Sequence, residues 1–151
     1  MGLRTTESVV VAAPPGRVFP HVAELDVYPS WLGLVHTAVC EPGGEPPAWS
    51  VEIRAHVGPF ARSKRLRMVR SVYEPDRQVE FERSEIDGRQ HARWSLRVEL
   101  DAEADSSTLV TMHLTYDGSL WTGGVLDRVL ADEVAKGRDG LAALVNAAPT
   151  H

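Results

Sequence analysis

The chain has 151 residues, which fits one domain over 1–151, and its 43% hydrophobic and 25% charged content is that of an ordinary globular protein. The formal net charge of −5 gives no electrostatic reason to expect a nucleic acid or an anionic membrane as partner. Cys40 is the single cysteine, so an intrachain disulfide is excluded and the cytoplasm is the expected location. The apolar run 9–13 is too short for a membrane span, so stable membrane insertion is not expected. Among the 16 basic residues only Lys64 and Lys136 are lysines, which is typical of GC-rich bacterial genomes.

The N-terminal third predicts a strand, two short helices and a second strand. Residues 3–12 are rich in β-branched side chains and predict a strand, which Pro14 and Pro15 end. Pro15 suits the first turn of a short helix, and Asp26 can cap a second one. A strand over 34–40 follows, before a loop rich in proline and glycine.

From Trp49 onward, apolar residues recur at every second position. This alternation predicts antiparallel strands with one apolar and one solvent-facing side. The predicted strands cover residues 49–57, 60–73, 78–83, 94–100 and 110–116.

The turns between these strands predict which residues lie opposite one another. Asp87-Gly88 is a strong signal for a two-residue hairpin, which would place Phe81 opposite Trp94. The next connection would then pair Trp94 with Leu114. Both registers keep apolar residues on one face, so we expect one continuous antiparallel sheet.

The last predicted element is a long helix over 124–147, with apolar residues at helical spacing. Gly137 and Gly140 weaken a helix by about 1 kcal/mol each relative to alanine, and we expect them to permit close approach to the sheet. Because parallel strands would need helical crossovers, the order of elements predicts an α+β fold with a curled antiparallel sheet.

Several segments resemble the START-like superfamily (also called SRPBCC or Bet v 1-like), which includes polyketide cyclase/dehydrase and lipid-transport proteins. The resemblance lies in residues 9–14 with Val18-Phe19, in 25–31 (Leu-Asp-Val-Tyr-Pro-Ser-Trp), and in 118–128. It implies the helix-grip fold, in which a seven-stranded sheet wraps the long helix and leaves a cavity between them.

Side chains on the apolar face, with the aromatic residues of the second short helix, are candidates to line that cavity; the alternative is a filled core. Tryptophan and tyrosine suit such a lining because each joins a large apolar surface to a polar atom. The expected ligand-binding residues are Tyr28, Trp31, Trp49, Leu66, Met68, Arg70, Phe81, Arg83, Trp94, Met112, Leu114, Tyr116, Leu126 and Leu130.

Arg70 and Arg83 fall on the apolar face, where a guanidinium requires a hydrogen-bonding partner. The partner is either a ligand oxygen or an internal group such as Glu85, unless the side chain reaches solvent at the cavity mouth; we favour the internal or rim interpretation. The resemblance to aromatase/cyclase members implies that Arg70 or Arg65 could assist enolate chemistry together with Tyr28.

The sequence contains no motif for a metal, a nucleotide or an acyl-transfer nucleophile. The six histidines do not cluster at metal-ligand spacing, so neither a metal nor another cofactor is expected.

Three functions are compatible with these patterns. The first is binding of a hydrophobic small molecule such as a lipid, quinone or polyketide, by a monomer or weak homodimer. The second is a polyketide cyclase or dehydratase acting in the same cavity. The third is an interaction module with a vestigial cavity. We favour binding, because Glu85 lies near a strand end and the apolar face offers no convincing general base.

Overall fold

The computed structural model describes residues 2–104, 106–117 and 125–147. Between the first two strands lie three short helical segments, α1 (Pro15–Val18), η1 (Phe19–His21) and η2 (Leu25–Ser30), and the long helix α2 (Val125–Ala147) comes last. The strands are β1 (Gly2–Val11), β2 (Val35–Cys40), β3 (Ala48–Val57), β4 (Phe60–Glu74), β5 (Gln78–Arg83), β6 (Arg93–Ala102) and β7 (Thr108–Asp117).

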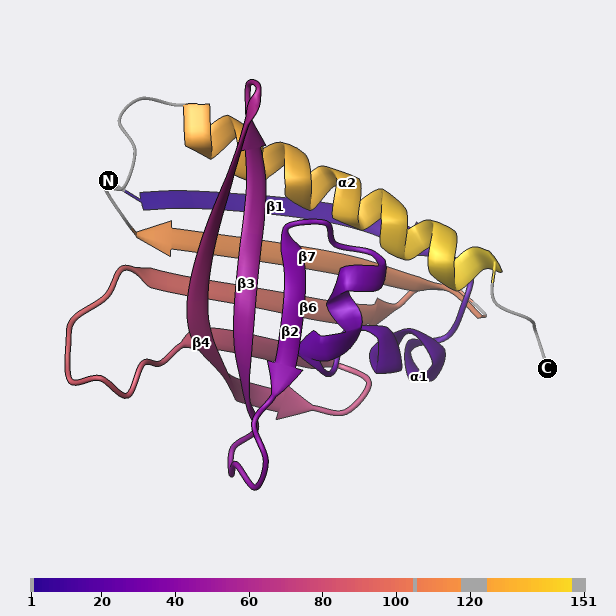
Figure 1. Ribbon diagram of the computed structural model, residues 1–151. Coiled ribbons are helices and arrows are strands. Elements are labelled where there is room, and N and C mark those ends of the chain that lie inside the picture. The colour runs from indigo at the N-terminus through magenta and orange to yellow at the C-terminus, as the bar shows by residue number, and fades with distance from the viewer. Residues whose placement is uncertain (1, 105, 118–124, 148–151) are drawn as a thin grey trace.

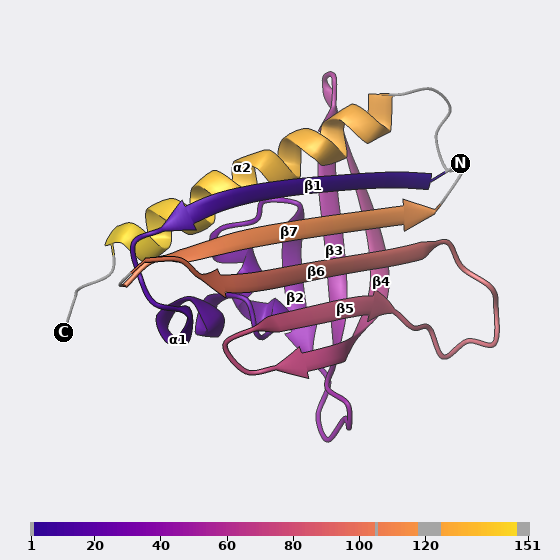
Figure 2. The same ribbon diagram turned by 180° about the vertical axis from the view of Figure 1, so that it is seen from behind.

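The strands form one seven-stranded sheet in the order β1-β7-β6-β5-β4-β3-β2, and every neighbouring pair is antiparallel. The sheet is strongly curled, so β2, β3 and β4 cross the direction of β1, β7 and β6 steeply, and α2 runs along β1 over the concave side (Figure 1). The same arrangement is visible from behind in Figure 2. The predicted α+β helix-grip architecture, with short helices between strands 1 and 2, is confirmed.

The alternation of apolar residues explains why one face of the sheet holds the core. Along β7, every second residue is buried, and the neighbouring strand β6 carries buried apolar side chains on the same face. Helix α2 covers these rows with Leu130, Val134, Leu141 and Val145, each of which is buried. The core therefore lies between the concave face and α2.

The predicted registers of two hairpins are wrong, each by two residues. Phe81 pairs with Leu96 rather than Trp94, and Trp94 pairs with Tyr116 rather than Leu114. The Asp87-Gly88 pair lies within a longer connection, since β5 ends at Arg83 and β6 begins only at Arg93. Because a shift of two residues returns each side chain to the same face, the prediction of inward and outward residues survives the error.

Helix α2 approaches the segment after η2 closely, and glycine makes this possible. A Cβ atom at Gly140 would lie 2.6 Å from the backbone oxygen of Trp31, and one at Gly137 would collide with the Leu32 side chain. The two glycines were expected to permit close approach to the sheet, but their closest neighbours belong to Trp31 and Leu32. They therefore fix the distance between α2 and this connecting segment.

Two polar contacts tie the same half of α2 to the N-terminal strand. The backbone N–H of Ala12 donates a hydrogen bond to Asn146 Oδ1 (2.9 Å), and Arg138 Nη1 lies 3.2 Å from Glu7 Oε1. Across the described ranges, neither α2 nor any shorter helix is long and apolar enough to cross a membrane.

Candidate functional site

Two small voids lie between the concave face of the sheet and α2. The first has a volume of about 50 Å³ and the second about 30 Å³. The first is lined by Leu34, Ile53, Arg54, Ala55, Arg62, Ser63, Lys64, Trp94, Tyr116 and Leu130. The second is lined by Leu25, Leu32, Leu34, Val35, Val51, Ile53, Leu66, Met68, Trp94, Leu96, Leu114 and Val134. Leu34, Ile53 and Trp94 are the three residues that line both voids.

Trp94 and Tyr116 are two buried aromatic residues in the lining of the first void. They are cross-strand neighbours on β6 and β7, and their rings pack at a centroid distance of 4.4 Å. The two residues are only 4% and 3% exposed, yet Trp94 Nε1 and the Tyr116 hydroxyl have no hydrogen-bond partner among the described residues. An unpaired buried polar group costs about 1–3 kcal/mol, so this pair is suited to an added hydrogen-bonding group.

A basic rim borders the first void at the far end of β4. Arg62 is exposed, whereas Lys64 is half-buried and lies opposite Ile53 of β3. Burial lowers the pKa of the Lys64 ammonium, the Arg83 guanidinium lowers it further, and the Glu85 carboxylate opposes this shift. The curl of the sheet carries the Lys64 side chain to the edge of the first void.

Arg70 is held by the protein itself. Its Nη1 donates a hydrogen bond to the backbone oxygen of Ala23 (2.9 Å), and its guanidinium lies 4.0 Å from the ring centre of Tyr73 and 5.9 Å from that of Trp49. A bulge in β4 next to Arg70 shifts the pairing with β5 at this point. Arg65, the other arginine with an implied role in enolate chemistry, is largely exposed and contacts Glu52 at 3.6 Å.

Tyr28, Trp31, Trp49 and Phe81 pack as an aromatic cluster outside the linings of the two voids. The Tyr28 hydroxyl donates to the backbone oxygen of Val22 (2.8 Å), and its complete burial raises its pKa well above the ordinary value. The indole N–H groups donate to backbone or carboxylate oxygens as well, that of Trp31 to His21 and that of Trp49 to Asp26, each at 2.9 Å. The polar atoms of this cluster are therefore already engaged.

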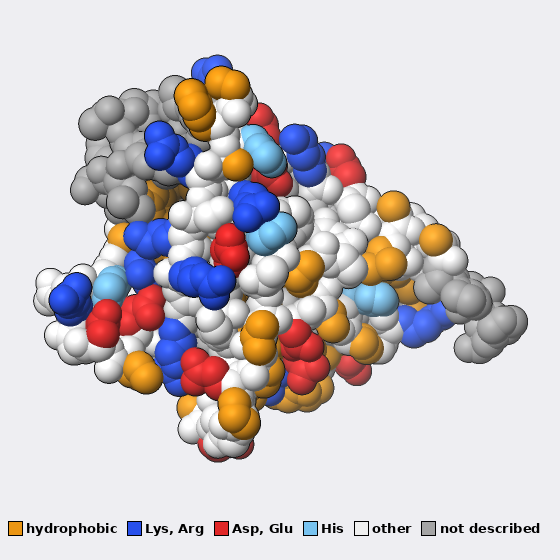
Figure 3. All heavy atoms as spheres, in the orientation of Figure 1, with side chains coloured by type: hydrophobic (Ala, Val, Ile, Leu, Met, Phe, Trp, Pro, Cys, Tyr) orange, Lys and Arg blue, Asp and Glu red, His pale blue; other side chains and the backbone are white. Residues whose placement is uncertain are grey.

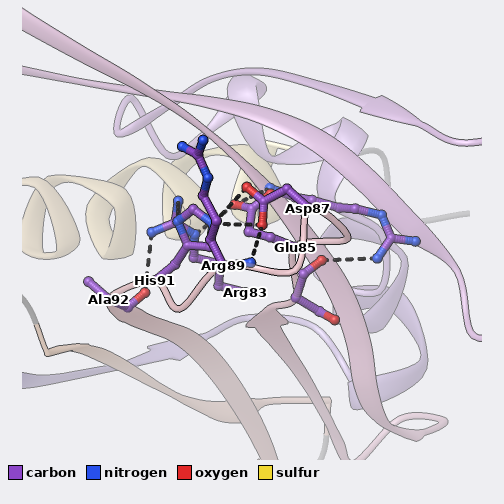
Figure 4. Close-up of polar contacts among 8 residues, drawn as sticks. Arg83, Glu85, Asp87, Arg89, His91 and Ala92 are labelled. Atoms are coloured by element: carbon purple, nitrogen blue, oxygen red, sulfur yellow. Dashed lines mark hydrogen bonds and ion pairs between the residues drawn. The ribbon is translucent and has the colours of Figure 1, made fainter.

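Arg83 belongs to a polar network built by the connection between β5 and β6 (Figure 4). Its Nε donates to Glu85 Oε2 at 2.7 Å, its Nη1 donates to the Ala92 backbone oxygen, and its Nη2 contacts His91 Nδ1. His91 in turn contacts Asp87, whose pKa is lowered chiefly by a hydrogen bond from the Arg89 backbone N–H. The internal partner considered for Arg83 is thus present, and its charge is balanced within this loop.

The other expected ligand-binding residues are divided between the voids and the core. Leu66, Met68 and Leu114 line the second void, and Leu130 lines the first. Met112 is fully buried but belongs to neither lining, and the Leu126 side chain lies outside what the structure describes.

Sequence reasoning missed other lining residues, including Leu34, Ile53 and Val134. Ile53 carried a usable signal, because it falls on the apolar side of a strand with clear alternation. Leu34 lies at the end of a loop, where no periodicity points inward. Within residues 2–104, 106–117 and 125–147, no group of three or more His, Cys, Asp or Glu is placed to hold a metal ion.

The sequence also matches a known family. A family model described as polyketide cyclase / dehydrase and lipid transport matches residues 3–148. The chain belongs to this family. The recognition of a START-like superfamily member is thereby confirmed, and no curated protein matches the chain.

Solved structures with the same fold include members of this superfamily. A START superfamily protein from Mycobacterium smegmatis superposes with a TM-score of 0.71 at 15% identity, over 94% of this chain and 96% of that one. The Zhui aromatase/cyclase from Streptomyces sp. R1128 gives a TM-score of 0.70 at 12% identity, over 96% of this chain and 94% of that one. The di-domain ARO/CYC StfQ of the steffimycin biosynthetic pathway gives 0.68 at 15% identity, and there 96% of this chain covers 51% of the other. At such low identities, the similarity shows the fold alone.

Proposed function

We propose that this family member binds an apolar small molecule, such as a lipid, quinone or polyketide-like compound, beside Trp94 and Tyr116. The observation that supports this proposal is that two residues lining the first void each carry a buried polar atom without a partner among the described residues. An indole N–H only donates, and a phenol can donate, so the matching ligand atom is an acceptor such as a carbonyl oxygen. Apolar side chains, including Leu34 and Leu130, supply the rest of the contact surface.

The size of the voids implies that binding requires the interior to widen. A volume of about 50 Å³ holds only a few water molecules. Pockets for drug-sized ligands measure about 300–1,000 Å³. Because Trp94 borders both voids, a rotation of its indole is the simplest change that would join them.

Native mass spectrometry of the protein purified from its own host tests this proposal. We expect a retained lipid-like mass, which Trp94→Phe and Tyr116→Phe should diminish. Trp31→Phe is the matched control, since the Trp31 indole already donates to His21 and lies outside both linings. Protein that is consistently empty would contradict binding and favour the interaction-module hypothesis.

A second candidate function is that of a polyketide cyclase or dehydratase, and the position of Lys64 favours it. An amine of lowered pKa at the rim of the first void can remove a proton next to a substrate carbonyl. Hydrogen bonds from Trp94 and Tyr116 to the carbonyl oxygen would stabilise the resulting enolate. In this proposal Lys64 takes the part of the base, whereas Arg70 and Tyr28 hold their surroundings in place through their backbone contacts.

Turnover of a poly-β-ketone mimic distinguishes catalysis from binding. Lys64→Gln should lower the turnover rate by a factor of about 10²–10⁴, the usual contribution of a general base. Arg65→Gln removes a neighbouring charge that faces away from the void and serves as the control. Arg70→Ala provides a further check, and unchanged turnover in this variant would exclude Arg70 from the reacting groups.

A further inference from the structure

The hairpin that joins β3 and β4 projects beyond the body of the protein (Figure 1). Its tip is the sequence Gly58-Pro59-Phe60, and Gly58 adopts a positive φ of 60°, as the tight turn requires. Phe60 is 64% exposed there. A large apolar side chain at the tip of a hairpin gains nothing from the protein's own core, and it is available to an external apolar surface.

Basic residues surround this tip. Residues 53–73 contain six arginines and lysines and no aspartate or glutamate, although the whole chain has a net charge of −5. Four of the six, Arg54, Arg62, Lys64 and Arg65, are nearest to Phe60 in the two strands. Figure 3 shows apolar side chains and Lys or Arg side chains together along the hairpin.

The alternation of the strands distributes these charges over both sides of the hairpin. Arg62 and Lys64 follow Phe60 on one side, and Arg54 and Arg65 lie on the other. Arg54, Arg62 and Lys64 also border the first void. Glu52 contacts both Arg54 (3.3 Å) and Arg65 (3.6 Å), so one carboxylate is shared by two guanidinium groups and the hairpin keeps a net positive charge. The Arg65 side chain is 76% exposed.

The order of apolar and basic groups along the hairpin matches the layers of a lipid surface. At about 3.4 Å per residue, Arg62 lies roughly 7 Å and Arg65 roughly 17 Å behind Phe60. Apolar groups of peripheral membrane proteins enter about 5–10 Å into the boundary between headgroups and acyl chains. Phe60 would reach this boundary while the basic side chains meet the lipid phosphates.

We propose that the tip of the β3–β4 hairpin is a docking surface for an anionic lipid bilayer. Phe60 enters the interface, and Arg54, Arg62, Lys64 and Arg65 bind the acidic headgroups. A nucleic acid is the weaker match, because its phosphates would face the apolar tip. The net charge alone argued against an anionic membrane, but the charges are distributed unevenly along the chain. This docking does not depend on a ligand in the voids.

Flotation with lipid vesicles tests the proposal. The full chain should float with vesicles of phosphatidylcholine mixed with phosphatidylserine, and not with phosphatidylcholine alone. High salt should release it, since screening weakens exposed charges. Arg65→Gln should weaken binding about fivefold, the value for one basic residue near an anionic surface. Phe60→Ser should weaken it by a similar factor or more.

Matched controls keep the outcome specific to the hairpin. Ile86→Ser removes a side chain that is 82% exposed on another loop, and Arg4→Gln removes an exposed charge on β1. Both should bind vesicles as the wild type does, and so should Tyr116→Phe, which alters the first void only. The proposal is overturned if the wild type does not float at low salt, or if the controls lose as much binding as the hairpin variants. Loss in Arg65→Gln without loss in Phe60→Ser would also overturn it and point to an acidic polymer.

Discussion

Replacing Tyr116 by phenylalanine removes a single buried oxygen atom and leaves the ring in place. The hydroxyl has no hydrogen-bond partner among the described residues, and the ring packs against Trp94 at 4.4 Å. A buried unpaired hydroxyl costs about 1–3 kcal/mol, and we take the lower end of this range because phenylalanine leaves the ring packing unchanged. We therefore expect Tyr116→Phe to raise the free energy of unfolding of the ligand-free protein by about 1 kcal/mol.

Tyr28 offers the same chemical change with the opposite expected sign. Its hydroxyl donates to the backbone oxygen of Val22 at 2.8 Å in a fully buried setting. Tyr28→Phe leaves that oxygen without its partner, so we expect a loss of about 1–3 kcal/mol. For a chain of this length, 1 kcal/mol corresponds to about 2–4 °C in Tm.

Urea unfolding followed by circular dichroism compares the two variants directly. Equal losses of stability in Tyr28→Phe and Tyr116→Phe would refute the reasoning, because the Tyr116 hydroxyl would then be satisfied within the free protein. With a ligand bound, we expect Tyr116→Phe to be less stable than the wild type, because phenylalanine cannot donate a hydrogen bond to the ligand oxygen. The sign of the stability change should therefore reverse for Tyr116→Phe and stay the same for Tyr28→Phe. Thermal shift with and without a candidate ligand measures this reversal.

Three further predictions concern the scaffold. Gly140→Ala should destabilise the protein by about 1–3 kcal/mol in urea unfolding despite the better helix propensity, because the new methyl group meets a backbone oxygen; a gain in stability would contradict the close approach. Burial raises the pKa of Tyr28 above 10.0, so its contribution to the free energy of unfolding is complete below that pH and is lost as the pH rises further. In unfolding measured at increasing alkaline pH, the stability of the wild type should therefore fall more steeply than that of Tyr28→Phe. Glu85→Gln leaves Arg83, whose side chain is 6% exposed, without its carboxylate and should lower the free energy of unfolding by about 2 kcal/mol. Glu82→Gln breaks a more exposed ion pair with Arg93 and should lower it by less than about 1 kcal/mol. Equal losses of stability in the two variants would show that burial of the ion pair does not matter here.

The fold could be predicted because its main signal is local. Alternation of apolar residues assigns each strand two faces, and those faces assemble in only a few ways around an amphipathic helix. The register between neighbouring strands was harder to predict from the sequence. Asp87-Gly88 is a strong hairpin signal, but the surrounding nine-residue connection is held by the network of Arg83, Glu85 and His91, which no local pattern specifies.

The candidate site was predictable in part for the same reason. The strand pattern placed Trp94 and Tyr116 on the inner face, and the structure brings them into contact. It could not show that Arg70 would meet the oxygen of Ala23, because that contact joins distant parts of the chain and follows a bulge in β4. It also could not show that the Tyr28 hydroxyl is used by a backbone oxygen, since that depends on how η2 packs.

The anchoring of α2 decides which part of the interior can widen. Gly140 lets the helix pack closely against the Trp31 backbone, and Asn146 binds the end of the helix to the backbone of Ala12. The C-terminal half of α2 is therefore held in place by these contacts. The residues that border the first void come earlier in the helix, at Leu130. We therefore expect any widening of the first void to involve the part of α2 around Leu130 rather than its anchored C-terminal half.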